Sequence, residues 1–324
     1  MKKVFKILMY LIVVVIVFVA GAIAYITIFL PNVGKPEDIK VISTPERIEH
    51  GKYLATSVMV CMDCHSTRDW SKFSGPPTPN TLGKGGDRFD QTAGFPGVFY
   101  ARNITPAGIG NWTDGEIFRT ITTGVDKNNK ALFPIMPYHY YGQLDKEDIY
   151  DVISYIKTLP SIKNEVPAPK PDFPFNIIEH LIPHKANLQT KPKESDTLAY
   201  GKYMTTASGC VECHTKADKG QIIAGLEFGG GREFNFPFGT LRTANITSDA
   251  TGIGGWTEEQ FVKEFKQYQD TSFHLPTVKP TDYNTIMPWT MYGQMKESDL
   301  KAIYAYLRTV KKQQNTVVKF TPKK

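Results

Sequence analysis

The chain contains four cysteines, and all four stand in two short stretches that share one pattern. Both stretches, Cys61–His65 and Cys210–His214, read Cys-x-x-Cys-His, which is the attachment signature of a c-type haem. Two cysteines three positions apart face the same side of a helical turn, so both thiols can add to the vinyl groups of one haem. The histidine that follows is carried under the iron. The sequence therefore predicts two covalently bound haem c groups, attached through Cys61, Cys64, Cys210 and Cys213, with His65 and His214 as proximal iron ligands.

Other chemistry for these cysteine pairs remains open on spacing alone. Two Cys-x-x-Cys pairs can build a four-cysteine zinc site, and each pair can form a thiol–disulfide redox couple or a structural disulfide. Neither alternative requires a histidine after the second cysteine of each pair. Neither explains the methionines that follow.

A Met-Pro pair follows each cysteine motif at a similar distance. Met136 lies 71 residues after His65, and Met287 lies 73 residues after His214. A methionine sulfur can bind the face of a haem iron opposite the histidine, so we expect Met136 and Met287 to be the distal ligands. The remaining histidines do not recur at equivalent positions in both halves; they are His50, His139, His180, His184 and His274. Of these, His139 and His274 stay open as alternative distal ligands. Iron held by histidine and methionine has no open position for a substrate, which favours electron transfer over catalysis.

The cysteine and methionine motifs belong to a longer internal repeat. The offset between the copies is 149 residues at the cysteines and 151 at the methionines. Three further pairs of segments match: His50–Leu54 with Tyr200–Met204, Asn103–Thr105 with Asn245–Thr247, and Gly108–Asp114 with Gly252–Glu258. One unit has been copied.

Helix signals recur in each copy. Thr44 before Pro45 caps a first helix, and Ser195 is expected to cap its counterpart. Middle helices are expected to open on capping boxes, Thr113 with Glu116 and Thr257 with Gln260. Apolar residues at the helical period predict final helices over about 145–158 and 297–310.

The N-terminus carries a long apolar segment. From Ile7 to Leu30 there are 24 residues without a charge, preceded by Lys2, Lys3 and Lys6. About 20 apolar residues span a bilayer, and flanking lysines tend to stay cytoplasmic. We expect a single-pass anchor in the inner membrane, with the haem domains on the periplasmic side, where haem c is attached in bacteria. The alternative is a cleaved signal peptide, for which Ala20-Gly21-Ala22 offers a small-x-small site.

The order of helix, Cys-x-x-Cys-His, Met-Pro and closing helix resembles the cytochrome c fold, twice. The Asn-Ile-Thr and Gly-Ile-Gly-x-Trp-Thr segments more narrowly resemble the cytochrome c subunits of periplasmic alcohol and aldehyde dehydrogenases and related membrane-bound dihaem cytochromes. The resemblance implies that Gly51 and Gly201 lie where the first and last helices of each domain cross. The expected fold is mainly α, with two tandem cytochrome c-like domains after one transmembrane helix. The expected boundaries are an anchor over 1–31, a tether over 32–43, domains over 44–160 and 195–312, a proline-rich linker over 161–194 and a basic tail over 313–324.

The expected function is electron transfer without catalysis. The net charge of +6 comes from scattered lysines, with no basic patch interleaved with aromatic residues, so nucleic acid is not an expected partner. The resemblance implies redox protein partners: a dehydrogenase or quinol-oxidising complex as donor, and a cytochrome or terminal oxidase as acceptor. The alternatives are a dihaem enzyme of the peroxidase type, which needs an open distal site, and a haem-based sensor.

Overall fold

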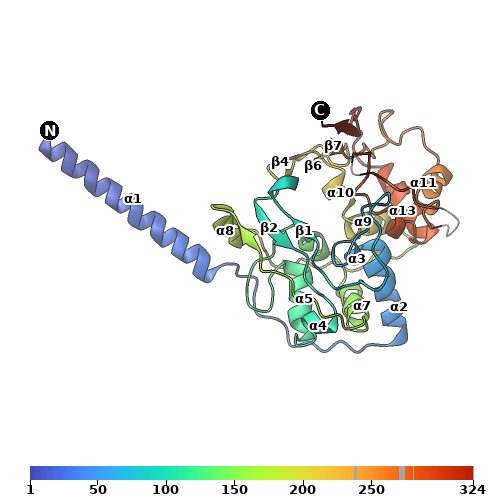
Figure 1. Cartoon of the computed structure of the whole chain (residues 1–324), viewed down its shortest axis with the longest axis horizontal. Helices are drawn as coiled ribbons and strands as arrows, with labels where there is room; N and C mark the ends of the chain where they lie inside the picture. The colour runs from blue at the N-terminus through green and yellow to red at the C-terminus, as the bar shows by residue number, and fades with distance from the viewer. Residues whose placement is uncertain (237–238, 270–273, 280, 324) are drawn as a thin grey trace.

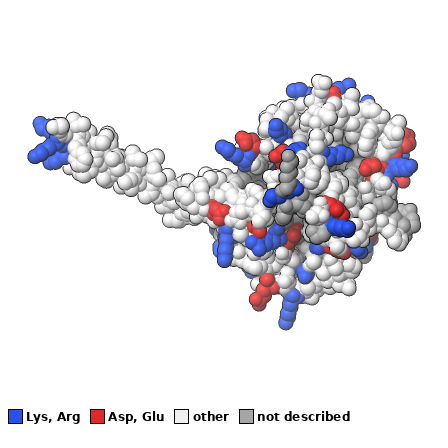
Figure 2. All heavy atoms as spheres, turned by 45° about the horizontal axis from the view of Figure 1, so that its top comes forward, with Lys and Arg blue, Asp and Glu red and all other residues white. Residues whose placement is uncertain are grey.

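The computed structural model describes residues 1–236, 239–269, 274–279 and 281–323. Its first element is the long helix α1 (Lys2–Phe29), which stands apart from the rest of the molecule (Figure 1). None of its residues is buried, and its mean hydropathy reaches 3.1 over 18 residues. In the described part of the chain it is the one helix long and apolar enough to cross a membrane. Figure 2 shows lysines at its free end and uncharged side chains along most of its length.

The first half of the body (residues 44–160) is built from short helices. The chain runs through α2 (Pro45–Tyr53), the five-residue π-helical turn η1 (Leu54–Val58), α3 (Cys61–Cys64), β1 (Arg88–Phe89), η2 (Gln91–Ala93), β2 (Gly97–Tyr100), α4 (Pro106–Ile109), α5 (Asp114–Thr123), α6 (Tyr138–Tyr141) and α7 (Lys146–Ile156). The final helix lies within the predicted range.

The second half (residues 195–312) repeats the order of the other helices, but residues 250–255 form turns where the first half has α4. Its elements are α9 (Thr197–Ala207), α10 (Cys210–Cys213), β4 (Ala217–Asp218), β5 (Gln221–Ile222), β6 (Glu233–Phe236), β7 (Gly239–Arg242), α11 (Glu258–Lys266), α12 (Trp289–Tyr292) and α13 (Glu297–Leu307). The antiparallel β6–β7 hairpin gains a third strand from β8 (Phe320–Pro322), which lies in the expected basic tail.

In each half the first and last helices cross at a glycine. A Cβ on Gly51 of α2 would lie 1.8 Å from the Asp151 carbonyl oxygen of α7. A Cβ on Gly201 of α9 would lie 2.0 Å from the Ala302 carbonyl oxygen of α13. No other residue type lets the two backbones approach so closely. The crossing that the family resemblance implied is therefore present in both halves.

The predicted helix caps are present with one exception. Both capping boxes form, Thr113 with Glu116 and Thr257 with Gln260. The prediction that Ser195 caps α9 is wrong. Asp196 occupies the N-cap, because its carboxylate accepts a hydrogen bond from the Ala199 backbone N–H.

The segment between the halves is partly ordered as secondary structure. It contains β3 (Lys170–Pro171), which pairs with β2, followed by α8 (Phe175–Ile178) and the 3₁₀ turn η3 (Glu179–Leu181). Helix α8 and η3 contact α1 close to where α1 reaches the body (Figure 1). The two halves share one hydrophobic cluster, which contains Val58 and Ile153 from the first half and Met204 and Ile303 from the second.

Candidate haem-binding sites

The two cysteine motifs form matching one-turn helices. Each begins after a residue in the left-handed region, Val60 at φ 45° before α3 and Gly209 at φ 62° before α10. No disulfide joins any two of the four cysteines. Burial raises the pKa of Cys61 and of Cys210 to about 12, in contrast to the low pKa of reactive cysteines in redox catalysts. Within the described residues no cysteine belongs to a group of three or more potential metal-ligand atoms, so the geometry does not favour a four-cysteine zinc site.

Both motif histidines are fixed through the same ring nitrogen. His65 Nδ1 lies 2.7 Å from the Arg102 carbonyl oxygen, and His214 Nδ1 lies 2.8 Å from the Ala244 carbonyl oxygen. A carbonyl only accepts, so Nδ1 carries the proton and Nε2 keeps its lone pair, the state that binds a metal. Burial lowers the pKa of both histidines, which keeps the rings neutral. The residues present thus fit a haem iron.

The loop that supplies these carbonyls is fixed by the repeated asparagine. Asn103 Oδ1 accepts from the Thr105 N–H and hydroxyl, and Asn103 Nδ2 donates to the Ile162 carbonyl after α7. Asn245 makes the same set of bonds to Thr247 and to the Gln313 carbonyl. The Asn-Ile-Thr motif therefore positions the histidine acceptor one residue before it. The acceptors at Arg102 and Ala244 were not predicted, because a backbone carbonyl leaves no mark on residue type.

A tyrosine ties each methionine loop to its cysteine motif. The Tyr141 hydroxyl donates to the Met59 carbonyl at 2.9 Å, two residues before Cys61. Its counterpart Tyr292 donates to the Ser208 carbonyl at 2.7 Å, two residues before Cys210. Met136 and Met287 are half-buried and pack against the shared cluster together with Cys61 and Cys210. In each half, the segments that carry the three expected haem contacts are thus held together by an equivalent bond.

The halves are joined by reciprocal tyrosine–aspartate bonds. The Tyr53 hydroxyl of α2 donates to Asp299 of α13 and accepts from the Lys296 N–H. The Tyr203 hydroxyl of α9 donates to Asp148 of α7 at 2.6 Å and accepts from the Asp145 N–H. Burial and the neighbouring carboxylates raise the pKa of both tyrosines, which stay protonated. Each half thus donates to the last helix of the other.

The acidic residue inside each cysteine motif has a different environment. Asp63 is buried and pairs with Arg68 at 3.0 Å, and its burial outweighs this pairing and raises its pKa to about 6. Burial also acts on Glu212, but contacts from His139, Arg232 and Tyr140 lower its pKa to about 2. Two of these three residues, His139 and Tyr140, lie on α6, the short helix that follows Met136. Helix α6 of the first half thus contacts the second cysteine motif.

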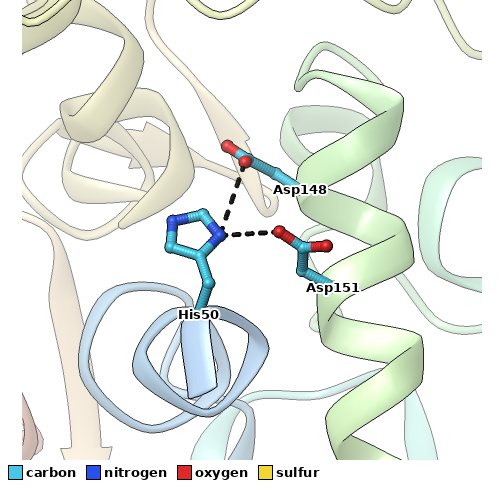
Figure 3. Close-up of side chains that lie close together, drawn as sticks. All are labelled: His50, Asp148 and Asp151. Carbon is cyan, nitrogen blue, oxygen red and sulfur yellow. Dashed lines mark hydrogen bonds and ion pairs between the residues drawn. The ribbon is translucent and has the colours of Figure 1, made fainter. Parts of the chain in front are cut away.

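The other histidines whose contacts the structure describes are engaged elsewhere. His50 on α2 lies 2.8 Å from Asp151 and 3.9 Å from Asp148, both on α7 (Figure 3). These three residues have the composition of a metal site. Their carboxylate oxygens are already occupied: Asp151 binds Arg47, and Asp148 binds the Lys191 ammonium and the Tyr203 hydroxyl. The group is therefore a network that joins helices and not a cation site.

Residues 198–311 match the family model of cytochrome c. Domains of this family carry covalently bound haem and transfer electrons.

Over longer stretches the chain is similar to cytochrome subunits of dehydrogenases. It is 28% identical to the fructose dehydrogenase cytochrome subunit of Gluconobacter japonicus over 81% of this chain and 52% of that protein. It is 26% identical to the cytochrome c subunit of alcohol dehydrogenase (quinone) from Gluconacetobacter polyoxogenes over 66% of this chain and 48% of that protein. It is 25% identical to a diheme cytochrome c-type protein of Cereibacter sphaeroides over 77% of this chain and 81% of that protein. The chain spans about half the length of the dehydrogenase subunits that it matches.

Proposed function

We propose that this chain is a membrane-anchored dihaem c-type cytochrome with two tandem haem domains, residues 44–160 and 195–312. The observation that carries the proposal is the duplicated set of bonds around each motif. His65 and His214 donate to equivalent carbonyls, and Tyr141 and Tyr292 fix equivalent methionine loops. If only one half bound haem, the other half would not require the histidine and tyrosine bonds that fix a haem site.

The proposed ligands are His65 with Met136 in the first half and His214 with Met287 in the second. Cys61, Cys64, Cys210 and Cys213 make the thioether bonds. Each bound haem supplies an iron that alternates between the ferrous and ferric states. The protein residues hold each histidine ring in the tautomer that binds iron and bury the site. With one histidine and one methionine of the chain as ligands, each haem iron would have no site left for a substrate and would serve electron transfer.

The partners follow from the membrane segment and the relatives. Helix α1 anchors the chain by one pass in the inner membrane, with both haem domains on the periplasmic side. The donor is a periplasmic or membrane dehydrogenase or a quinol-oxidising complex. The acceptor is a cytochrome or terminal oxidase. The similarity to dehydrogenase cytochrome subunits supports a subunit role in such a complex.

Haem content and spectra of the full chain test the proposal. The pyridine haemochrome should give two haems per polypeptide, and the ferric protein should show a methionine-to-iron charge-transfer band with the intensity of two haems. One haem per chain would overturn the dihaem assignment. A high-spin haem, or peroxide turnover at enzymatic rates, would instead favour a dihaem peroxidase.

A further inference from the structure

A pocket lies at the junction of α1 with the first half. It has a volume of about 580 Å³, in the range of ligand-binding pockets. One wall consists of the last residues of α1, Thr27–Leu30, and another is the loop Asn128–Lys130. His180 of η3 completes the lining and is fixed there, because its Nδ1 donates to the Leu30 carbonyl at 2.9 Å.

The charge of the pocket is positive. Lys35 and Lys130 line it, and both are exposed. Neither lysine forms an ion pair with any residue in the described part of the chain. No aspartate or glutamate is among the described residues that line the pocket. Two free ammonium groups beside asparagine amides make a site that favours an anion.

The depth of the pocket relative to a bilayer follows from α1. The apolar segment ends at Leu30, so its last turn marks the boundary between the hydrocarbon core and the headgroups. Ile28, Phe29 and Leu30 line one side of the pocket. The pocket therefore opens at the level of the phosphates when α1 spans the membrane.

The neighbouring surface is apolar. Helix α8 and η3 contact α1 (Figure 1). Residues 173–181, which include both elements, expose the side chains of Phe173 by 78%, Ile178 by 43% and Leu181 by 54%. Apolar side chains beside basic groups are the pattern of segments that lie in the membrane interface. These side chains offer a surface for acyl chains next to a site for an anion.

We propose that this pocket binds the headgroup of an anionic phospholipid, with its acyl chains against α1 and the α8–η3 surface. Lys35 and Lys130 pair with the phosphate. The bound lipid thereby holds the first half against the membrane at a fixed height. The proposal rests on the proposed membrane span of α1, but not on the number of haems.

Calorimetric titration of the full chain in a neutral detergent tests the site. The probes are dihexanoyl phosphatidylglycerol, dihexanoyl phosphatidylcholine and inorganic phosphate. We expect the anionic lipid to bind, the zwitterionic lipid to bind at least tenfold more weakly, and free phosphate to compete poorly. Equal binding of the two lipids would overturn the proposal. If inorganic phosphate binds as tightly as the anionic lipid, the proposal that the ligand is a lipid is overturned.

The variant Lys35→Gln with Lys130→Gln should weaken binding of the anionic lipid about 30-fold, since one lysine near an anionic surface contributes about 1 kcal/mol. The matched control is Lys263→Gln with Lys311→Gln, which removes the same charge from two exposed positions. Lys263 lies on α11 and Lys311 follows α13, and both helices lie on the side of the body away from α1 (Figure 1). Equal weakening in both variants would overturn the proposal, because it would indicate general attraction only. Alkaline carbonate extraction separately tests whether α1 is an integral span, and haem content tests the proposed function.

Discussion

In the first half the loop that carries Met136 rests on aromatic side chains, whereas in the second half the loop that carries Met287 is held by the other half. Phe133, three residues before Met136, stacks on Phe99 at 4.1 Å and contacts Phe95 and Phe175 edge-on. These contacts come from the first half and from α8, which follows it.

The second loop depends on Ser74, which lies after His65 in the first half. The Ser74 hydroxyl donates to the Met287 carbonyl at 2.6 Å and accepts from the Trp289 N–H at 3.0 Å. The Ser74 N–H also donates to the Asn284 side chain at 2.8 Å. The copied motifs are therefore equivalent in the bonds that hold histidine, but not in what supports methionine. A substitution that disrupts the first half should therefore disturb the position of Met287 more than a substitution in the second half disturbs Met136.

Removal of one pair of cysteines has the largest expected effect. Cys61→Ala with Cys64→Ala, and Cys210→Ala with Cys213→Ala, should each reduce the covalent haem from two per chain to one. We expect the first variant also to weaken the methionine band of the remaining haem, because Ser74 lies in the loop that follows His65. Pyridine haemochrome and near-infrared absorption measure both effects. If both variants weaken the methionine band of the remaining haem equally, the two methionine loops do not differ in their support.

Loss of a methionine ligand should lower one reduction potential and leave the other nearly unchanged. Met136→Ala and Met287→Ala each remove a thioether that stabilises ferrous iron, and axial ligation spans about 0.8 V across haem proteins. We expect a fall by a sizeable fraction of that range, together with new binding of small ligands at the altered iron. Potentiometric titration resolves the two haems. A methionine whose loss moves neither potential is not a ligand.

The acidic residues of the two motifs should give opposite responses to pH. Asp63 has a folded pKa of about 6, above its ordinary 3.8, so its contribution is fully present below about pH 4 and is lost as pH rises through 6. Glu212 has a folded pKa of about 2, below its ordinary 4.5, so its contribution is present above pH 4.5 and is lost as pH falls toward 2. Each effect amounts to at most about 3 kcal/mol.

Thermal unfolding of the full chain between pH 3 and 8 measures these contributions. Asp63→Asn should remove the stability gained between pH 7 and 4. Glu212→Gln should lower stability at pH 7 and flatten the acid limb. The same response from both variants would show that the two environments do not differ.

The reciprocal tyrosines should also differ. Tyr53→Phe and Tyr203→Phe each leave a buried carboxylate short of one donor, at a cost of about 1–3 kcal/mol. Asp148 keeps the Lys191 ammonium at 2.6 Å, whereas among the described bonds Asp299 keeps only hydroxyl donors from Tyr200 and Ser298. We therefore expect Tyr53→Phe to lower the free energy of unfolding more than Tyr203→Phe. Chemical denaturation of the holoprotein measures both losses. A larger loss for Tyr203→Phe than for Tyr53→Phe would refute the prediction.

The smallest expected effect is that of Ser74→Ala. It removes one donor and one acceptor from the second methionine loop, which should cost about 1–2 kcal/mol locally. Half of the methionine band should disappear at a lower temperature, while the other half is retained. Ser161→Ala, an exposed serine, is the control. Uniform loss of the band would argue against a specific role in the second half.

The local signals in the sequence predicted the helices well. Both capping boxes and the final helices follow from patterns within a few residues, and the structure contains them. Strand β3 was not predicted, because two residues in a proline-rich segment show no periodicity. Its pairing with β2 is decided by tertiary contact.

The tyrosine–aspartate bonds between the halves were not predicted from the sequence. Tyr53 and Tyr203 occupy equivalent positions, each directly after a repeated Gly-Lys pair. Their acceptors lie 246 and 55 residues away, so no local pattern joins them. The repeat does align Asp148 with Asp299, and that match, together with the paired tyrosines, was the available signal.

These tyrosine bonds also set an order for biosynthesis. A chain made from its N-terminus presents Tyr53 long before Asp299, whereas Tyr203 follows Asp148 after only 55 residues. The acceptor for Tyr53 lies on α13, the final helix of the second half. The first half can therefore fold early, but it is joined to the second half through Tyr53 only after α13 has been made. Until then the face of the first half that packs against α13 stays exposed.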